Sequence, residues 1–336
     1  MKKTSVTICI TGAGTATALS VIKGTREQNE FAVRVVACDH NDNVSGHYMA
    51  DKFYKIPSAT KPTFLKALLH IVKKEHVQLL IPIVDYEFKT IAAAKAQFTK
   101  LGCTVILSDL PAIEICIDKF KTMKLFDSLG LPRPKSYSLH EVKKIHPSYP
   151  LFIKPSLFGR ATIDAFKMDN TTDLHYYVNK VSRPIIQQYI EGHEITVDIL
   201  NDFKGKFVAA LARARIETKS GLSIKGVVLN DPHLTASVKR ISESLPIIGP
   251  ANIQCFKRGK RYIFSEVNPR FSGAHAFSIA AGLNSIHLLL KLYTGQTVKT
   301  NALHFKTGLR VIRYWEEIFV DTKNRPYQAG YTLIKE

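Results

Sequence analysis

The stretch from residue 252 to residue 270, NIQCFKRGKRYIFSEVNPR, decides the fold prediction for this chain. Two apolar runs flank a short basic turn that contains Gly259, and this pattern predicts a β-hairpin. On the second strand, Glu266 and Asn268 are two residues apart, so both side chains point to the same face of the sheet. Arg270 follows just beyond the strand.

The length of the hairpin turn decides whether a third oxygen ligand joins this pair. With a three-residue turn from 258 to 260, Gln254 lies opposite Phe264 and diagonal to Glu266, on the same face. A two-residue turn would move Gln254 to the other face. We expect the three-residue turn, which brings the side-chain oxygens of Gln254, Glu266 and Asn268 together.

Oxygen ligands beside an arginine suit a magnesium ion and a phosphate chain. Mg²⁺ usually takes one or two carboxylates together with substrate phosphates, and arginine pairs well with phosphate. The alternative is a hairpin on which Glu266 and Arg270 form a surface ion pair. The spacing alone leaves both interpretations open.

The composition is that of an ordinary globular protein with a strongly basic charge. The 336 residues can form two or three packed lobes, with 45% hydrophobic and 22% charged residues. No apolar run reaches the ~18 residues of a membrane span, and the start MKKTSVTICITGAG fits a first strand better than a signal peptide.

The formal net charge of +19 comes from lysines that are scattered along the chain. We therefore expect a solvated basic surface and an anionic nucleotide ligand, with neither a membrane nor a specific nucleic acid as partner. The cysteines form no C-x-x-C pair and sit mostly in apolar runs, which predicts buried free thiols in a reducing cytoplasm. They are Cys9, Cys38, Cys103, Cys116 and Cys255.

The N-terminal third alternates strands with helices, an order that predicts βαβ units and a parallel sheet. A glycine turn follows the first strand. The predicted strands are 5–10, 31–39, 78–84 and 103–109, and the predicted helices are 16–28, 63–75 and 87–101.

Two features of this sheet bear on ligands. Gly12 and Gly14 with Asp39 resemble part of a dinucleotide fingerprint, but Thr17 stands at the third glycine position. Asp85 and its neighbour Glu87 follow the strand 78–84, at the sheet edge where ligands gather, so either carboxylate could contact substrate; a helix-capping role for Asp85 is equally consistent.

The segment QCFKRGKRYIFSEVNPRFSG resembles the metal-binding hairpin of ATP-grasp enzymes, above all the ATP-grasp halves of the carbamoyl phosphate synthase large subunit. The resemblance covers roughly residues 5–300. It implies an α/β ATP-grasp fold: a Rossmann-like parallel-sheet (pre-ATP-grasp) domain followed by a larger antiparallel-sheet ATP-binding domain. The boundaries would be 1–110 for the first, 111–300 for the second (small lobe about 120–190, large lobe about 191–300), and 301–336 for a C-terminal extension packing on the ATP-grasp domain.

The resemblance also assigns the phosphate-binding lysines. Lys119, in a helix predicted over 112–129, matches the basic residue that reaches nucleotide phosphates, although a surface lysine is the alternative. Lys154, in the strand 150–156, matches a second one, and a lysine in an apolar run is costly unless it meets an anion. The loop at 157–162 has one glycine where the family has several, and Arg160 could substitute charge for amide contacts.

The segment PIIQQYIEGHEITVDIL, residues 184–200, predicts two strands around Gly192. It resembles the adenine hinge of ATP-grasp proteins, which implies that the backbone of Gln188, Tyr189 and Ile190 meets the adenine. Glu194 would then hold the ribose hydroxyls. A structural role for these side chains is the alternative.

Two further strands are predicted within 206–229, joined at Ser220-Gly221. Arg213, Arg215 and Lys225 on these strands resemble a basic segment near an acyl-phosphate site. A solvated strand face remains open for Arg213 and Lys225, and Arg215 is favoured for the catalytic role.

The resemblance implies an ATP-dependent carboxylate–amine (or ammonia) ligase that forms an acyl phosphate and releases ADP and phosphate. Arg270 and Arg215 would be catalytic, and Gln254, Glu266 and Asn268 would hold Mg²⁺, with Mn²⁺ as a possible substitute. The partners would be small-molecule substrates, and a homodimer is possible. Two other classes remain: a nucleotide-binding regulatory module, suggested by the glycine-poor loop, and a nicotinamide-dependent oxidoreductase, suggested by the first glycine turn.

Overall fold

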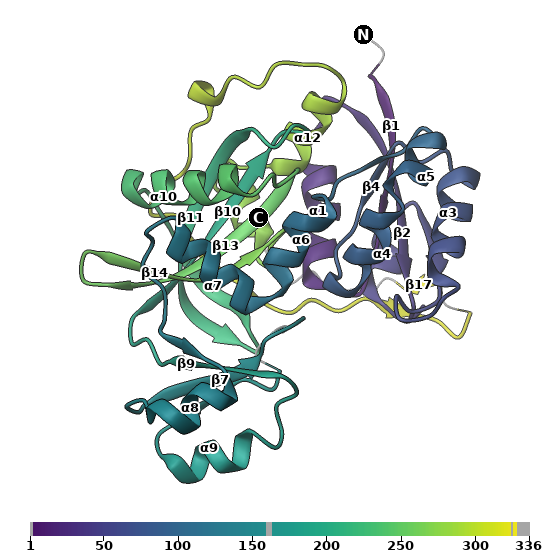
Figure 1. Ribbon diagram of the computed structural model, residues 1–336. Helices are drawn as coiled ribbons and strands as arrows, with labels where there is room; N and C mark the ends of the chain where they lie inside the picture. Colours follow the sequence, from purple (N-terminus) through teal and green to yellow (C-terminus); the bar gives the residue numbers. More distant parts are fainter. Residues whose placement is uncertain (1–2, 159–162, 324, 328–336) are drawn as a thin grey trace.

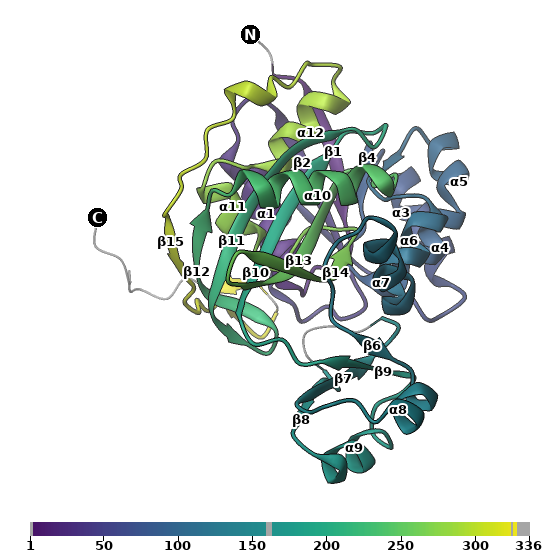
Figure 2. The ribbon, with the colours of Figure 1, turned by 60° about the vertical axis from the view of Figure 1, so that its left-hand side comes forward.

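The structure, a computed structural model, describes residues 3–158, 163–323 and 325–327. Figures 1 and 2 show three parts: a parallel sheet with its helices, a large antiparallel sheet beside it, and a small lobe that projects from the large sheet. The ATP-grasp architecture predicted from the hairpin is therefore confirmed, with antiparallel sheets following a parallel one.

The N-terminal domain is a parallel sheet with the strand order β3-β2-β1-β4-β5. Both faces of β1 are buried, because Val6, Ile8 and Ile10 pack with α1 while Cys9 packs under α3 to α5, as expected for a covered parallel sheet. The elements are β1 (Ser5–Ile10), α1 (Ala16–Glu27), β2 (Ala32–Asp39), α2 (Ser45–Met49), β3 (Lys52–Lys55), α3 (Phe64–Lys74), β4 (Leu79–Ile81), η1 (Asp85–Glu87), α4 (Phe88–Ala93), α5 (Lys95–Lys100) and β5 (Thr104–Val105).

The sequence prediction missed α2 and β3, and it merged elements that are separate. The helix predicted over 87–101 is η1, α4 and α5, and the helix predicted over 112–129 is α6 (Leu110–Ile117) and α7 (Lys119–Ser128). The predicted helix 112–129 is interrupted at Asp118, whose extended backbone ends α6. The Asp118 carboxylate accepts hydrogen bonds from the N–H groups of Phe120 and Lys121. Asp118 is thus an N-cap.

The small lobe is an antiparallel sheet of order β6-β9-β7-β8 with two helices on one face. Leu151 and Ile153 pack under these helices with Ile186, whereas Phe152 and Lys154 alternate to the opposite face. The elements are β6 (Ser136–Tyr137), α8 (Leu139–Ile145), β7 (Leu151–Pro155), β8 (Phe166–Met168), α9 (Thr171–Tyr177) and β9 (Pro184–Gln188).

The large lobe is an antiparallel sheet of order β14-β13-β10-β11-β12-β15. Figure 2 shows α10 lying across this sheet, where Ile195, Val197 and Ile199 of β10 pack against it. The elements are β10 (His193–Asn201), β11 (Phe207–Lys219), β12 (Leu222–Leu229), α10 (Pro232–Ser244), β13 (Pro250–Arg258), β14 (Arg261–Asn268), α11 (His275–Ala280), α12 (Ser285–Tyr293), η2 (Thr300–Ala302), β15 (Arg310–Ile312), β16 (Phe319–Val320) and β17 (Pro326–Tyr327).

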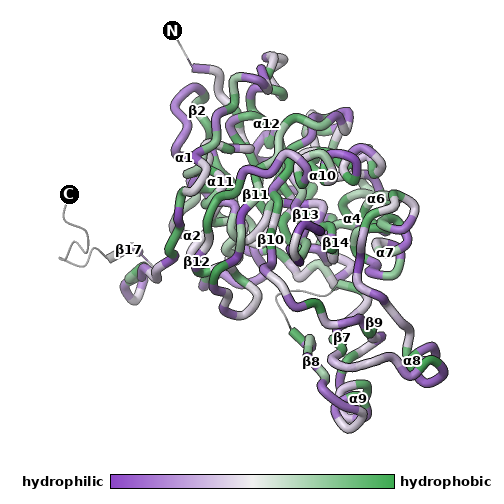
Figure 3. The backbone as a smooth tube through the Cα atoms, turned by 90° about the vertical axis from the view of Figure 1, so that its left-hand side faces the viewer, coloured by the Kyte–Doolittle hydropathy of each residue, from purple (hydrophilic) through white to green (hydrophobic). Residues whose placement is uncertain are grey.

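The remaining general expectations can be compared with the described residues. All five cysteines are buried and free, as predicted. Hydrophilic stretches, purple in Figure 3, are spread over all three parts of the molecule. Across the described ranges, no helix combines the length and the apolar character needed to cross a bilayer.

Candidate active site

The hairpin that organises the site has a different turn from the predicted one. Arg258 pairs with Arg261, so the turn has two residues, Gly259 and Lys260, and the predicted three-residue turn is wrong. Taken alone, this turn would place Gln254 on the wrong face.

A β-bulge corrects the register further along the hairpin. Cys255 pairs with Phe264, but the next pair is Gln254 with Glu266, so Ser265 is the extra residue. Gln254 therefore lies directly opposite Glu266, and Asn252 lies directly opposite Asn268. The predicted convergence of Gln254, Glu266 and Asn268 on one face is obtained by another route.

The same sheet face continues across the large lobe as a polar row. Thr196 pairs with Gln254 on one side and with Arg213 on the other, and Asp198 pairs with Asn252. Directly paired residues share a face, so these side chains point away from α10. The apolar residues between them point toward it.

Two lysines approach the hairpin, one from α7, which packs on β14, and one from the small lobe. Lys119 begins α7, where its backbone N–H donates to the carbonyl of Ser156 at 2.9 Å, and its Nζ lies 4.0 Å from Glu266 Oε1. Lys154, on β7, is half-buried and forms no ion pair within 4.0 Å among the described residues. Burial lowers the pKa of Lys154 to about 8; the Glu266 carboxylate opposes this shift and Lys119 adds to it.

A cavity of about 590 Å³ lies between the small and large sheets and extends to the N-terminal domain. Every residue to which the resemblance gives a catalytic, nucleotide-binding or metal-binding role lines this cavity, apart from the basic residue Lys225. These residues are Lys119, Lys154, Gln188, Tyr189, Ile190, Glu194, Arg215, Gln254, Glu266, Asn268 and Arg270.

At the hinge end of the cavity, two of the three predicted backbone amides already have partners. The N–H of Gln188 donates to Lys135 and that of Tyr189 donates to Pro150, at 2.8 and 3.1 Å. The Ile190 N–H donates to no group in the described part of the chain. The sequence reasoning missed Gln187, which is buried on the cavity wall with its Nε2 donating to Ser136 Oγ at 2.8 Å.

Both arginines predicted to be catalytic are paired with acids. Arg215 forms an ion pair with Glu194 and donates through Nη2 to the carbonyl of Gly221 at 2.7 Å. Arg270 holds Asp85 through Nε and Nη2, at 3.0 and 3.3 Å, and so ties the hairpin to the N-terminal sheet. Asp85 is thus paired with a residue 185 positions further along the sequence.

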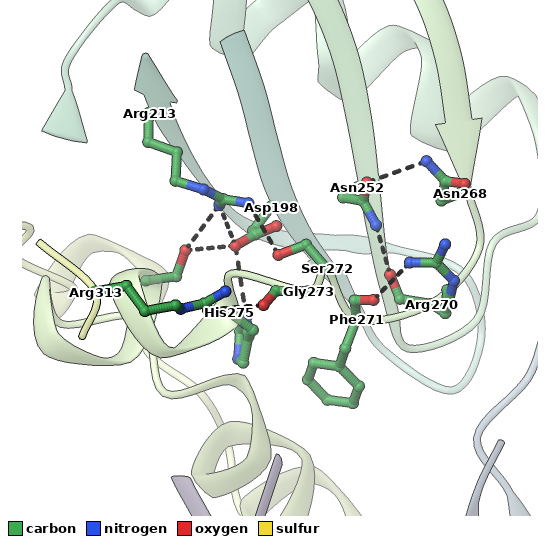
Figure 4. Close-up of polar contacts among 11 residues, drawn as sticks. Asp198, Arg213, Asn252, Asn268, Arg270, Phe271, Ser272, Gly273, His275 and Arg313 are labelled. Carbon is green, nitrogen blue, oxygen red and sulfur yellow. Dashed lines mark hydrogen bonds and ion pairs between the residues drawn. The ribbon is translucent and has the colours of Figure 1, made fainter. Parts of the chain in front are cut away.

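Beside the hairpin lies a buried charged cluster, drawn in Figure 4. Arg213 is 2% exposed, so the solvated alternative is wrong for it. Its Nη1 donates to Asp198 Oδ2 at 2.5 Å and its Nη2 donates to Ser272 Oγ at 2.9 Å. Although burial favours protonation, Arg213 and His275 hold the pKa of Asp198 well below its usual range.

Two other residues lie away from the cavity. Lys225 pairs with Glu217 at 2.7 Å, and both side chains are about half exposed, so the solvated strand face is correct there. Glu87 is buried, accepts a hydrogen bond from Thr11 Oγ1 at 2.5 Å, and does not line the cavity. Desolvation raises its pKa to about 8. Of the two carboxylates that could contact substrate, Asp85 lines the cavity and Glu87 does not.

The polar groups of the first glycine turn, Gly12 to Gly14, are bonded within the protein. Asp39 accepts hydrogen bonds from the N–H groups of Gly14 and Asn41, at 2.8 and 3.0 Å. A Cβ at Gly46 would lie 2.3 Å from the carbonyl oxygen of Ala13, so α2 packs directly on this turn. The buried Asp39 carboxylate is already used by the protein, which argues against the nicotinamide interpretation.

The glycine-poor loop is described only at its start. Leu157 bridges to Asp118, and the Phe158 ring stacks on Tyr86 with centroids 5.2 Å apart. Residues 159–162, including Arg160, lie outside the described residues.

Comparisons with protein families agree with this geometry. The family described as "ATP-grasp in the biosynthetic pathway with Ter operon" matches residues 180–317, and "PylC-like, N-terminal domain" matches residues 8–106. The arginine-specific carbamoyl phosphate synthase large chain of Bacillus subtilis is 25% identical over 309 residues, which cover 86% of this chain and 29% of the relative. The large chain from Thermoanaerobacter sp. is 27% identical over 271 residues, or 74% and 25% of the two chains.

This chain thus spans between a quarter and a third of the length of these relatives. Among solved structures, N5-carboxyaminoimidazole synthetase from Staphylococcus aureus with ADP matches with a TM-score of 0.69 and 17% identity, over 88% of this chain and 79% of that one. The biotin carboxylase domain dimer of Hydrogenobacter thermophilus 2-oxoglutarate carboxylase, in complex with MgADP, ADP and bicarbonate, matches with a TM-score of 0.70 and 16% identity, over 89% and 72%. At these identities the structural likeness establishes the fold. Together, the hairpin, the two facing sheets and the family matches show that this chain is a member of the ATP-grasp family, distantly similar to the carbamoyl phosphate synthase large chain and carrying a PylC-like N-terminal domain.

Proposed function

We propose that this protein is an ATP-dependent carboxylate–amine (or ammonia) ligase that works through an acyl phosphate. The observation that carries the proposal is the convergence of Lys119, Lys154 and Glu266 on one cavity between two sheets. Five basic side chains line this cavity against three acidic ones: Lys119, Lys154, Arg213, Arg215 and Arg270 against Asp85, Glu194 and Glu266. Such an excess of positive charge favours a polyanionic ligand.

The nucleotide is proposed to lie between the two sheets. Its adenine would meet the hinge from Gln188 to Ile190, where the Ile190 N–H, which has no acceptor among the described residues, supplies a donor. Its phosphates would meet Lys119 and Lys154. A lysine whose charged form is disfavoured by burial gains most from a phosphate, since the phosphate compensates for lost hydration.

The donor set of the hairpin fits Mg²⁺. Glu266 supplies a carboxylate, and the amides of Gln254 and Asn268 supply neutral oxygens. Asn268 donates through Nδ2 to Asn252 Oδ1 at 3.1 Å, which leaves its own Oδ1 available as an acceptor. The ion would neutralise negative charge on the phosphates.

The proposed reaction has two steps. A substrate carboxylate oxygen attacks the γ-phosphorus, which breaks the bond to the β-phosphate oxygen and releases ADP. The amine nitrogen then attacks the acyl carbon, and phosphate leaves with the former carboxylate oxygen while the nitrogen loses a proton. Lys119, Lys154 and Arg270 would stabilise charge on the phosphoryl oxygens. Water must be excluded because it would hydrolyse the acyl phosphate.

The test is ADP release in the presence of ATP and Mg²⁺, with and without a panel of small carboxylic acids and with hydroxylamine as the nucleophile. We expect slow ADP release with ATP alone and faster release with the correct acid, accompanied by a hydroxamate. ADP release without a hydroxamate from any acid would contradict the ligase. Bound ATP with no ADP release in any mixture would instead indicate a regulatory module.

A further inference from the structure

One end of the cavity is formed by the start of α1 in the N-terminal domain and by the loop after Arg270, whereas the adenine hinge follows β9 of the small lobe. Gly14 to Thr17 and Ser272 to Ala274 both line it. The two segments touch: a Cβ placed on Gly273 would lie 3.7 Å from Thr17 Oγ1 and 2.8 Å from Leu222 Cδ2. The proposed ligase chemistry leaves this end of the cavity without an assigned occupant.

The backbone amides at the start of α1 can be accounted for one by one. Those of Ala13, Gly14 and Thr15 donate to Cys38, Asp39 and Gly12, and that of Ala18 donates to Thr15 Oγ1. In the described structure, the N–H groups of Ala16 and Thr17 have no acceptor. Two free donors at the N-terminus of a twelve-residue helix favour an anion.

The side chain of Thr17 supplies an independent indication. Thr17 is only 7% exposed and lines the cavity, yet its hydroxyl forms no hydrogen bond within the described residues. The hydroxyl oxygen is open to the cavity and has no partner among the described residues, so it is available to bond a ligand. The hydroxyl is on the cavity wall beside the two free amides.

The charges around this end also favour an anion. Arg213 donates a hydrogen bond to Ser272 Oγ, and Arg313 Nη2 donates to the carbonyl of Gly273 at 2.9 Å. Two guanidinium groups are thus bonded to this loop (Figure 4). Burial and the neighbouring Arg213 lower the pKa of Arg313. Asp198 is the acid within this cluster, and it offsets one of the two positive charges.

Two other acids lie nearby, and both are engaged. Asp39 accepts from the amides of Gly14 and Asn41, with His40 Nδ1 3.0 Å from its Oδ1. Asp85 is held by Arg270. Neither carboxylate takes up the free donors at the start of α1.

We propose that this end of the cavity, here called the α1 subsite (Ala16, Thr17, Arg213, Ser272 and Gly273), binds an anionic group on the amine substrate. The substrate class is then an amine that carries a carboxylate or a phosphate, with an amino acid as the simplest example. Ser272 and Gly273 of the α1 subsite line the same cavity as Arg270, so an amine anchored there would lie in the cavity that holds the proposed reacting centre. This inference rests on the proposed ligase function for the role of its ligand.

The test uses the full chain saturated with Mg²⁺ and a non-hydrolysable ATP analogue, which occupies the nucleotide part of the cavity. Calorimetric titrations compare each of the common amino acids with its decarboxylated amine, and phosphoethanolamine with ethanolamine. We expect at least one amine with a carboxylate or phosphate to bind while its counterpart without that group does not. The two series distinguish a carboxylate from a phosphate.

Three threonine variants locate the binding. Thr17→Val removes the hydroxyl with little change of shape, and should weaken the anionic amine at least about tenfold, because hydrogen bonds to charged groups are strong. Thr17→Ser keeps the hydroxyl and should bind like the wild type. Thr25→Val is the matched control, since Thr25 is buried on the same helix and its hydroxyl bonds to Val21. Gly273→Ala adds a Cβ in the subsite and should weaken binding by an independent route.

Three outcomes would overturn the α1 subsite: equal binding of amines with and without the anionic group, no binding of either, or equal effects of Thr17→Val and Thr25→Val. These results are separable from the ligase test. Selective binding without ADP formation would leave the subsite standing and reject the ligase. Amide formation only with amines that lack an anionic group would support the ligase and reject the subsite.

Discussion

Lys154 is the residue at which burial and charge conflict most directly. Its amine is in the cavity wall without an ion-pair partner among the described residues, and desolvation lowers its pKa from 10.5 to about 8. Between these two pH values the unfolded chain binds more protons than the native protein. Lys154 therefore makes the native state more stable as the pH rises through this window.

Nucleotide affinity should show the opposite trend. A phosphate favours the charged lysine, so the dissociation constant for ATP should increase above pH 8, by up to about tenfold per pH unit for a single proton. Calorimetric titrations from pH 7 to pH 9.5 measure this. Lys154→Met should bind weakly and without that pH dependence, and adenosine, which has no phosphate, should show no such trend with the wild type. A flat profile for ATP in the wild type would contradict the assignment of Lys154 to phosphate.

Glu266 supplies the one carboxylate of the proposed metal site. Glu266→Gln keeps the shape of the side chain, which is about one-fifth exposed, and should leave the fold intact. It should remove most of the Mg²⁺-dependent part of the thermal stabilisation by ATP, because the ion loses its charged ligand. Glu217→Gln is the control, since Glu217 is an acid of the same sheet that pairs with Lys225 at the surface. Equal thermal shifts for the two variants would show that Glu266 does not bind the metal.

At the scale of elements, the hairpin shows which part of the register the sequence contains. The spacing of Glu266 and Asn268 predicts a shared face without any knowledge of the turn. The bulge at Ser265 is set by the pairing of two whole strands, and no local pattern marks it. The correct face for Gln254 was thus predicted from an incorrect turn, because the two-residue turn and the bulge cancel.

The buried ion pair between β10 and β11 gives a stability prediction. Removing one charge, as in Arg213→Met, leaves Asp198 buried without its main partner and should cost about 3–5 kcal/mol of the free energy of unfolding. Lys225→Met breaks an exposed pair on the same sheet and should cost less than about 1 kcal/mol. Urea unfolding measures both. A loss below about 1 kcal/mol for Arg213→Met would contradict the structural role of this pair.

At the scale of the whole molecule, the hydrophobic cores do not follow the domain boundaries. Val6 and Ile8 of the N-terminal sheet share one core with Leu211 of the large sheet and Leu289 of α12. The helix face of the small lobe has a separate core around Ile153. The N-terminal sheet and the large sheet share a core and should therefore unfold together. The small lobe has its own core, so we expect it to unfold locally without the rest of the molecule.

Native-state hydrogen exchange tests this division. Amides of β7, β8 and β9 should exchange through an opening that is less costly than global unfolding, and ATP with Mg²⁺ should slow them. Amides of β1 and β11 should exchange together, at the global free energy. Earlier exchange of the whole N-terminal sheet would show that it is a separate unit.

The sequence predicted which residues line the cavity better than it predicted the elements around it. Lys119, Glu194 and Arg270 belong to local motifs, and all of them line the cavity. Arg213, whose role the sequence left open, and Glu87 depend on partners that no local pattern marks: Asp198 on the neighbouring strand and Ser278, 65 residues away, for Arg213, and Thr11, 76 residues away, for Glu87. The end of α6 at Asp118 was missed because Asp118 acts as the N-cap of α7, which the periodicity of apolar residues does not reveal.

The central claim is that ATP activates a carboxylate as an acyl phosphate, and isotope transfer tests it most directly. The acid identified by ADP release is labelled with ¹⁸O in its carboxylate and incubated with ATP, Mg²⁺ and the amine in ordinary water. The account predicts one ¹⁸O atom in each phosphate released, because the attacking carboxylate oxygen leaves with the phosphorus, and it predicts none with Glu266→Gln, which should not turn over. Phosphate that carries no label while ADP is released would show that water is the acceptor, and would contradict the account.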